Sequence, residues 1–105
     1  MGPKTQKLLI VLDQLIKVLE HDGDTHWSQW MRSTRARLLA SDYSGITYLL
    51  SAYGGMGSFN DVVLGQSGVD GVFAWKPGHI ELNEQFNSLR AEAAQLAKAI
   101  RNSQK

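Results

Sequence analysis

No cysteine occurs among the 105 residues of this chain. Its absence excludes disulfide bonds, catalysis by a thiol and zinc sites built from cysteine, and it suits a reducing compartment, so we expect a cytoplasmic location. Charge of one sign is also lacking, since 11 lysine and arginine residues face 10 aspartates and glutamates, for a net charge of +1. Such a balance gives no general attraction to nucleic acid or to an anionic membrane, and we expect neither as a partner.

Long hydrophobic runs are missing as well. The run from Leu8 to Leu12 covers five residues, which is too short for a signal-peptide core or a membrane span. The chain has instead an ordinary globular composition, with 43% hydrophobic and 20% charged residues. At this length we expect one domain over residues 1–105 with a modest core.

Apolar residues recur at helical spacing in four stretches of the chain. The first stretch is the clearest, because its leucines at positions 8, 12, 15 and 19 follow a four-three-four spacing. The spacing predicts helices at about residues 5–21, 25–40, 43–53 and 80–102. We therefore expect an all-α fold, a small antiparallel bundle of about four helices.

Residues 54–79, between the third and fourth predicted helices, lack this periodicity and are rich in glycine and polar residues. Two short apolar pieces, around 62–64 and 69–75, could form a strand pair or packed coil, and the sequence leaves both possibilities open. Segments this long without helix or strand are uncommon in compact domains and are often functional. We predict a long, ordered, glycine-rich loop that packs on the helices and carries the working surface.

Three glycines within four positions open this segment. A phosphate-binding loop would follow a strand and end in Gly-Lys-Ser/Thr, whereas this segment follows a predicted helix and has no such lysine. We interpret it as a structural turn, held on the helices by burial of the apolar side chains of Met56, Phe59, Val62 and Leu64. The residues assigned to this structural role are Gly54, Gly55, Met56, Gly57, Ser58, Phe59 and Asn60.

Residues 21–26 bring two histidines and two aspartates together, which are side chains that can bind a transition metal. Gly23 suits the end of the first helix, however, and Asp24 suits the N-cap of the second. We therefore expect a structural turn and no metal. Ser58 has no Gly-x-Ser-x-Gly motif around it, so we also expect no catalytic residues, no cofactor and no enzymatic activity.

Four side chains between the third and fourth helices are candidates for contact with a protein partner. Phe73 and Trp75 are residue types that often anchor interfaces. Asp61 and Asp70 could face a basic cleft on the partner and speed encounter. A second possibility stays open for Asp61, in which its carboxylate closes a turn through hydrogen bonds.

The string Tyr-Gly-Gly-Met-Gly-Ser-Phe-Asn-Asp at 53–61, with His26-Trp27 upstream and Asp42-Tyr43-Ser44-Gly45 between them, resembles the signature of a small bacterial domain family of uncharacterised function. The resemblance covers about residues 24–65 and implies no established chemistry. In build, the chain is also similar to bacterial immunity proteins and antitoxins.

These resemblances, and the lack of a catalytic constellation, favour a bacterial, non-enzymatic protein-binding module. In its most specific form this is an immunity protein that neutralises a toxin by stoichiometric binding, with the cognate toxin as the partner. The alternative is a regulatory protein that binds a small ligand or nucleotide with the glycine-rich loop.

Overall fold

The computed structural model describes residues 1–69 and 71–103, and it places four helices in the order that the sequence predicts. The elements are α1 (Pro3–His21), α2 (Thr25–Leu39), α3 (Ser44–Leu50), the 3-10 helix η1 (Phe59–Asp61), β1 (Gln66–Val69), β2 (Val72–Trp75) and α4 (His79–Ser103). The expected small helical bundle agrees with this structure. The strictly all-α class does not, because β1 and β2 form a two-stranded antiparallel sheet.

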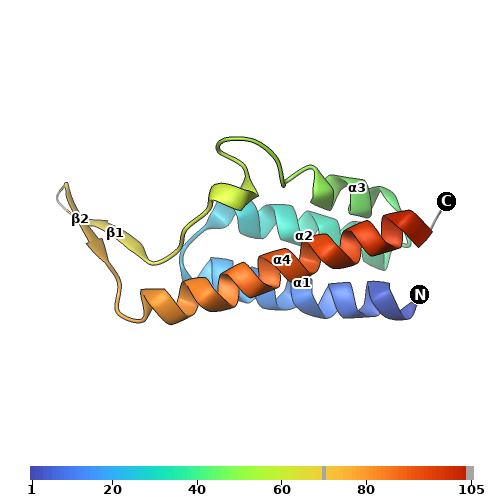
Figure 1. Cartoon of the computed structure of the whole chain (residues 1–105), viewed down its shortest axis with the longest axis horizontal. Helices are drawn as coiled ribbons and strands as arrows, with labels where there is room; N and C mark the ends of the chain where they lie inside the picture. Colours follow the sequence, from blue (N-terminus) through green and yellow to red (C-terminus); the bar gives the residue numbers. More distant parts are fainter. Residues whose placement is uncertain (70, 104–105) are drawn as a thin grey trace.

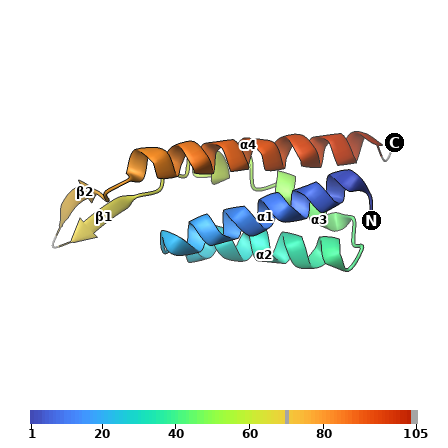
Figure 2. The same cartoon turned by 90° about the horizontal axis from the view of Figure 1, so that it is seen from below.

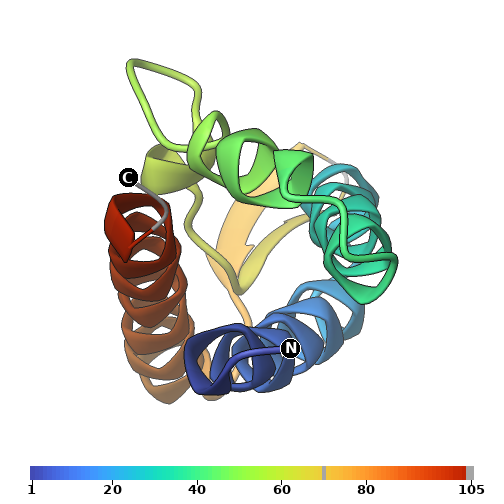
Figure 3. The ribbon, with the colours of Figure 1, turned by 90° about the vertical axis from the view of Figure 1, so that its right-hand side faces the viewer.

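The helices form an elongated body with the hairpin at one end. Helix α1 packs against α2 and α4, and the short helix α3 packs against the same two helices. Each of the four helices therefore has two helical neighbours. A view along the long axis shows the four helices around a shared interior (Figure 3). The chain measures 50 × 23 × 20 Å, and the β1–β2 hairpin extends beyond the ends of the helices (Figures 1 and 2).

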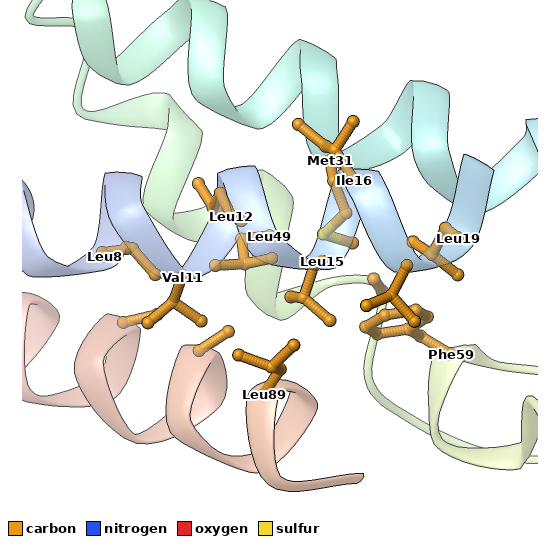
Figure 4. Packing of buried hydrophobic residues seen from close by; sticks show 14 of the residues in the cluster. Leu8, Val11, Leu12, Leu15, Ile16, Leu19, Met31, Leu49, Phe59 and Leu89 are labelled. Carbon is orange, nitrogen blue, oxygen red and sulfur yellow. The ribbon is translucent and has the colours of Figure 1, made fainter. Parts of the chain in front are cut away.

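The core is built on the leucine face of α1 that the four-three-four spacing predicts. Leu8, Leu12, Leu15 and Leu19 are all fully buried. Around them lie buried residues of the other helices and Phe59 from η1 (Figure 4). Each such side chain contributes roughly 1.5–3 kcal/mol by burial, so this face accounts for much of the attraction between the helices.

The turn between α1 and α2 is built by its glycine and its second aspartate. Gly23 adopts a φ of 81°, a left-handed conformation that favours glycine and ends α1. The Asp24 carboxylate accepts a hydrogen bond from the backbone N–H of Trp27 at 2.9 Å and so caps α2. These are the two structural roles expected for the turn.

The segment between α3 and α4 is divided into distinct pieces and is not the single loop that we expected. Helix α3 ends at Leu50, before the predicted end at 53, and a turn leads to η1. A strand pair does form, but it joins residues 66–69 to 72–75, whereas the apolar piece at 62–64 has no regular structure. Over residues 1–69 and 71–103, no helix has the length and apolar character needed to cross a membrane.

Candidate functional site

The glycine-rich turn before η1 is closed by hydrogen bonds among its own residues. Ser58 Oγ donates to the carbonyl oxygen of Gly54 at 2.8 Å, and Ser58 N–H donates to that of Gly55 at 3.2 Å. Asp61 Oδ2 accepts from the N–H of Gly57 at 2.7 Å, so its carboxylate closes the turn. Because the N–H groups of Gly57 and Ser58 bond within the turn, they are not directed at an external anion.

Phe59 anchors this turn to the bundle. Its side chain is fully buried, and its ring centroid lies 5.1 Å from that of Trp27 and 5.5 Å from those of Tyr53 and Phe86. Leu64, also expected to anchor the segment, is 1% exposed, and Val62 is half-buried. The anchor therefore consists of Phe59 and the apolar residues that follow it.

Met56 does not share in this packing, and the prediction that it helps to hold the loop is wrong. Its side chain is 100% exposed. The physical reason is its place between Gly55 and Gly57, in a turn that closes on itself and extends away from the helices (Figure 3). A loop residue can be apolar and still lie outside the core, because no periodic spacing fixes which way it points.

Arg90 of α4 holds η1, which follows this turn, to the bundle. Its Nη1 donates to the carbonyl oxygens of Phe59 at 2.7 Å and Val62 at 3.0 Å, and its guanidinium lies 4.6 Å from the ring centre of Phe86. Tyr53 Oη donates to the carbonyl oxygen of Arg90 at 2.7 Å. Burial lowers the pKa of Arg90 and raises the pKa of Tyr53 well above its ordinary value. Sequence reasoning missed this pair, since the contacts join segments about thirty residues apart.

The base of the hairpin is clamped to the ends of two helices. Asn83 Nδ2 donates to the carbonyl oxygen of Leu64 at 2.9 Å, and Asn83 Oδ1 accepts from Leu64 N–H at 2.8 Å. Asp22 Oδ1 accepts from Gly65 N–H at 2.9 Å and lies 3.3 Å from Lys76 Nζ. Lys76 N–H closes the base by donating to the carbonyl oxygen of Gly65 at 2.7 Å.

Beyond this base, the hairpin displays apolar side chains to solvent. All four residues of β2 are exposed, with Val72 at 65%, Phe73 at 59% and Trp75 at 45%. The Phe73 and Trp75 rings lie edge to face with centroids 5.1 Å apart, and Trp75 stacks on His79 at 4.8 Å. Ile80, in the first turn of α4, is 60% exposed. We name Val72, Phe73, Trp75 and Ile80 the hairpin surface.

The structure brings together two of the four residues predicted to contact a partner. Phe73 and Trp75 both belong to the hairpin surface. Asp61 lies instead at the end of η1, where its carboxylate accepts a hydrogen bond from Gly57 of the glycine-rich turn. Asp70 lies outside the described residues.

Two other members of the hairpin surface, Val72 and Ile80, were not predicted. The sequence signal that could have identified the hairpin is the dipeptide Asp70-Gly71 between Val69 and Val72, because Asp-Gly between β-branched residues is typical of a two-residue hairpin turn.

The acidic residues of the 21–26 turn have partners of their own. Asp24 caps α2, and Asp22 holds the hairpin base. In the part of the chain that the structure describes, no three histidine or acidic side chains are grouped so that they could hold a metal ion.

A family model described as "Domain of unknown function (DUF6966)" matches residues 20–72, which is half of the chain. The matched range begins at the end of α1, contains α2, α3 and the glycine-rich turn, and reaches the first residue of β2. No curated protein and no solved structure matches the chain. The chain is therefore a member of the DUF6966 family.

Proposed function

We propose that the chain is a non-enzymatic protein-binding module whose contact area is the hairpin surface. The observation that carries this proposal is the exposure of Phe73 and Trp75, whose ring centroids lie 5.1 Å apart, on an element that projects from the helical body (Figure 1). Isolated exposed apolar residues are ordinary, but a contiguous group that includes two aromatic rings is typical of an interaction site. Large aromatic residues are also the usual anchors of binding energy.

The clamped base supports the same proposal. Asp22 and Asn83 hold Leu64 and Gly65 with three hydrogen bonds, and Asp22 also pairs with Lys76, so the hairpin leaves the bundle in one direction. A surface that is already held in place loses less conformational entropy when a partner binds. The hairpin is thus pre-organised for a contact, although its own strands are short.

The chemistry of the surface favours an apolar contact on the partner. Lys76, the nearest cation, is paired with Asp22, and β2 has no charged residue. In the specific form that we propose, the partner is a bacterial toxin and the chain acts in the cytoplasm as its immunity protein.

The test is capture of a partner by the tagged full chain from its native cell, followed by measurement of the affinity. We expect Trp75→Ala to weaken binding by about 2 kcal/mol, which is roughly thirty-fold. The matched control is Ile10→Ala, because Ile10 is 60% exposed on α1 and lies outside the hairpin surface. Both variants should keep the helical circular dichroism of the unmodified chain.

Two results would contradict the proposal. If Met56→Ala abolished binding while Trp75→Ala did not, the contact would lie at the tip of the glycine-rich turn. If the purified chain instead carried a bound small molecule and no protein, the ligand-binding alternative would replace the protein-binding one.

A further inference from the structure

The hydrogen-bond register of the hairpin determines which backbone groups face its open edge. Lys76 N–H donates to the carbonyl oxygen of Gly65, so these residues form a hydrogen-bonded pair. Antiparallel ladders alternate, and the next such pair is Ser67 with Ala74. The residues between, Phe73 and Trp75, therefore direct their N–H and C=O groups outward, along the free edge of β2.

This edge lacks the features with which proteins usually protect an unpaired strand. Charged residues, proline and bulges are the common devices, and the sequence Val72-Phe73-Ala74-Trp75 contains neither charge nor proline. The register with β1 is continuous, without a bulge. Among the described residues the sheet has two strands, so no third strand of the chain covers β2. An exposed, apolar and regular edge is suited to pairing with another strand.

The order of residues along β2 fits a second copy of the same strand. If two β2 strands run antiparallel with Ala74 opposite its counterpart, Phe73 of each copy lies opposite Trp75 of the other. The outward N–H and C=O groups of both strands then meet in hydrogen-bonded pairs. Each pair also joins two aromatic rings across strands, an arrangement that stabilises antiparallel sheets.

The side chains permit this approach. Phe73 and Trp75 already lie on one face, 5.1 Å apart, so two copies would gather four rings on one side of a continuous sheet. Ala74 points to the other face, where a methyl group meets a methyl group at the symmetry axis. The strand has no charge, so nothing of like sign is brought together.

We propose that two copies of the chain associate by antiparallel pairing of β2 with β2, which makes a four-stranded sheet with a two-fold axis at Ala74. The contact is isologous, as in most homodimers. Strands of four residues bury less than the roughly 1,200 Å² of stable interfaces, so the dimer dissociates on dilution. This inference uses the same hairpin as the proposed function, but it does not require a second protein.

The test is sedimentation equilibrium of the purified full chain at concentrations from about 10 μM to 1 mM, the range in which weak association is measured. We expect the unmodified chain to shift from monomer to dimer. Ala74→Lys or Ala74→Glu alone should raise the dissociation constant at least tenfold, because two like charges meet at the axis. An equimolar mixture of the two variants should recover a dimer at least as tight as that of the unmodified chain.

Ser67→Lys is the matched control, because Ser67 is the β1 partner of Ala74. The new lysine has the same charge as in Ala74→Lys but lies one strand away from the axis. It should dimerise like the unmodified chain. Circular dichroism of every variant should match that of the unmodified protein, since Ala74 is exposed.

A chain that stays monomeric at the highest concentration would overturn the inference. So would a dimer that the Ala74 variants leave unchanged, or a mixture that associates no better than its components. These outcomes are separate from partner capture. Recovery of a partner by a monomeric chain would preserve the proposed function alone, and charge-dependent pairing without any partner would preserve the dimer alone.

Discussion

Phe59 and Met56 lie three positions apart and should respond to truncation in opposite ways. Phe59 is fully buried among three aromatic rings, so Phe59→Ala leaves a cavity and should destabilise the fold by about 3–5 kcal/mol. Met56 is completely exposed, and Met56→Ala should leave stability unchanged. Denaturant unfolding of both variants checks the pair. Equal stability of Phe59→Ala and the unmodified chain would refute the anchoring role of Phe59.

Tyr53 should make stability depend on pH in the alkaline range. Burial raises its pKa above the ordinary value of 10.0, with a smaller opposing effect from the charge of Arg90. Near and above pH 10 the unfolded chain therefore loses the phenolic proton while the folded chain keeps it. The stabilisation is complete below about pH 10 and is lost as pH rises, with a slope of at most about 1.4 kcal/mol per pH unit.

Tyr53→Phe should remove this part of the slope between about pH 9 and 11, measured as the free energy of unfolding in denaturant. Tyr43→Phe is the control, because it removes a phenol that is 40% exposed in the folded chain. An unchanged slope in Tyr53→Phe would mean that the phenol of Tyr53 titrates alike in both states.

At the scale of elements, Asn83 of α4 holds the segment that leads into the hairpin. It makes two hydrogen bonds to Leu64 and a third to the carbonyl oxygen of His79. Asn83→Ala should leave the Leu64 groups unpaired, at a cost of about 1–3 kcal/mol in holding the hairpin base. Since roughly 1.4 kcal/mol corresponds to a factor of ten, amide hydrogen exchange in residues 64–76 should become at least tenfold faster. Exchange of the α1 amides should not change.

Asn87→Ala is the comparison for this prediction, because Asn87 lies one turn further along α4 and bonds to Arg90. Its loss should leave exchange in the hairpin unaffected. If the hairpin amides of Asn83→Ala exchanged as slowly as those of the unmodified chain, the hydrogen bonds of Asp22 alone would account for holding the hairpin base.

The elements differ in how far the sequence predicts them, and the reason is physical. The leucine face of α1 and the cap of α2 at Asp24 rest on local spacing and local hydrogen bonds, so they could be inferred from neighbouring residues. The hairpin could not be decided in the same way. Its strands have four residues each, and all of β2 is exposed, so burial imposes no alternation on the sequence.

The candidate site was predicted only in part for a related reason. Phe73 and Trp75 could be named from residue type, since large aromatic residues in an irregular segment favour an interface. The clamp at Asp22 and Asn83 joins distant parts of the chain, and no spacing in the sequence predicts such a contact. The burial of Met56 was predicted wrongly, because the turn that contains it closes on itself. Of the two roles left open for Asp61, the structure shows the closing of this turn by its carboxylate.

For the molecule as a whole, the separation of core and contact surface is the central feature. Buried residues of the bundle form one cluster over α1, α2, α3, η1 and α4, while β2 contributes no residue to it. Stability and binding should therefore be separable by removing the hairpin. Gly65 and Lys76 form a hydrogen-bonded pair at its base, so a two-residue turn can join them without changing the register.

The variant that tests this replaces residues 66–75 by Asn-Gly, so that Gly65 leads directly through the turn to Lys76. The helices keep their packing against one another, and Asp22 and Asn83 keep their bonds to Gly65 and Leu64. His79 at the start of α4 loses the stacked ring of Trp75, which lies outside the core. We expect helical circular dichroism and a melting temperature within a few degrees of the full chain, because exposed strands add little to stability. Partner capture and self-association should both be lost. A shortened chain that fails to fold would show that the hairpin is structural, and one that still binds its partner would move the contact surface elsewhere.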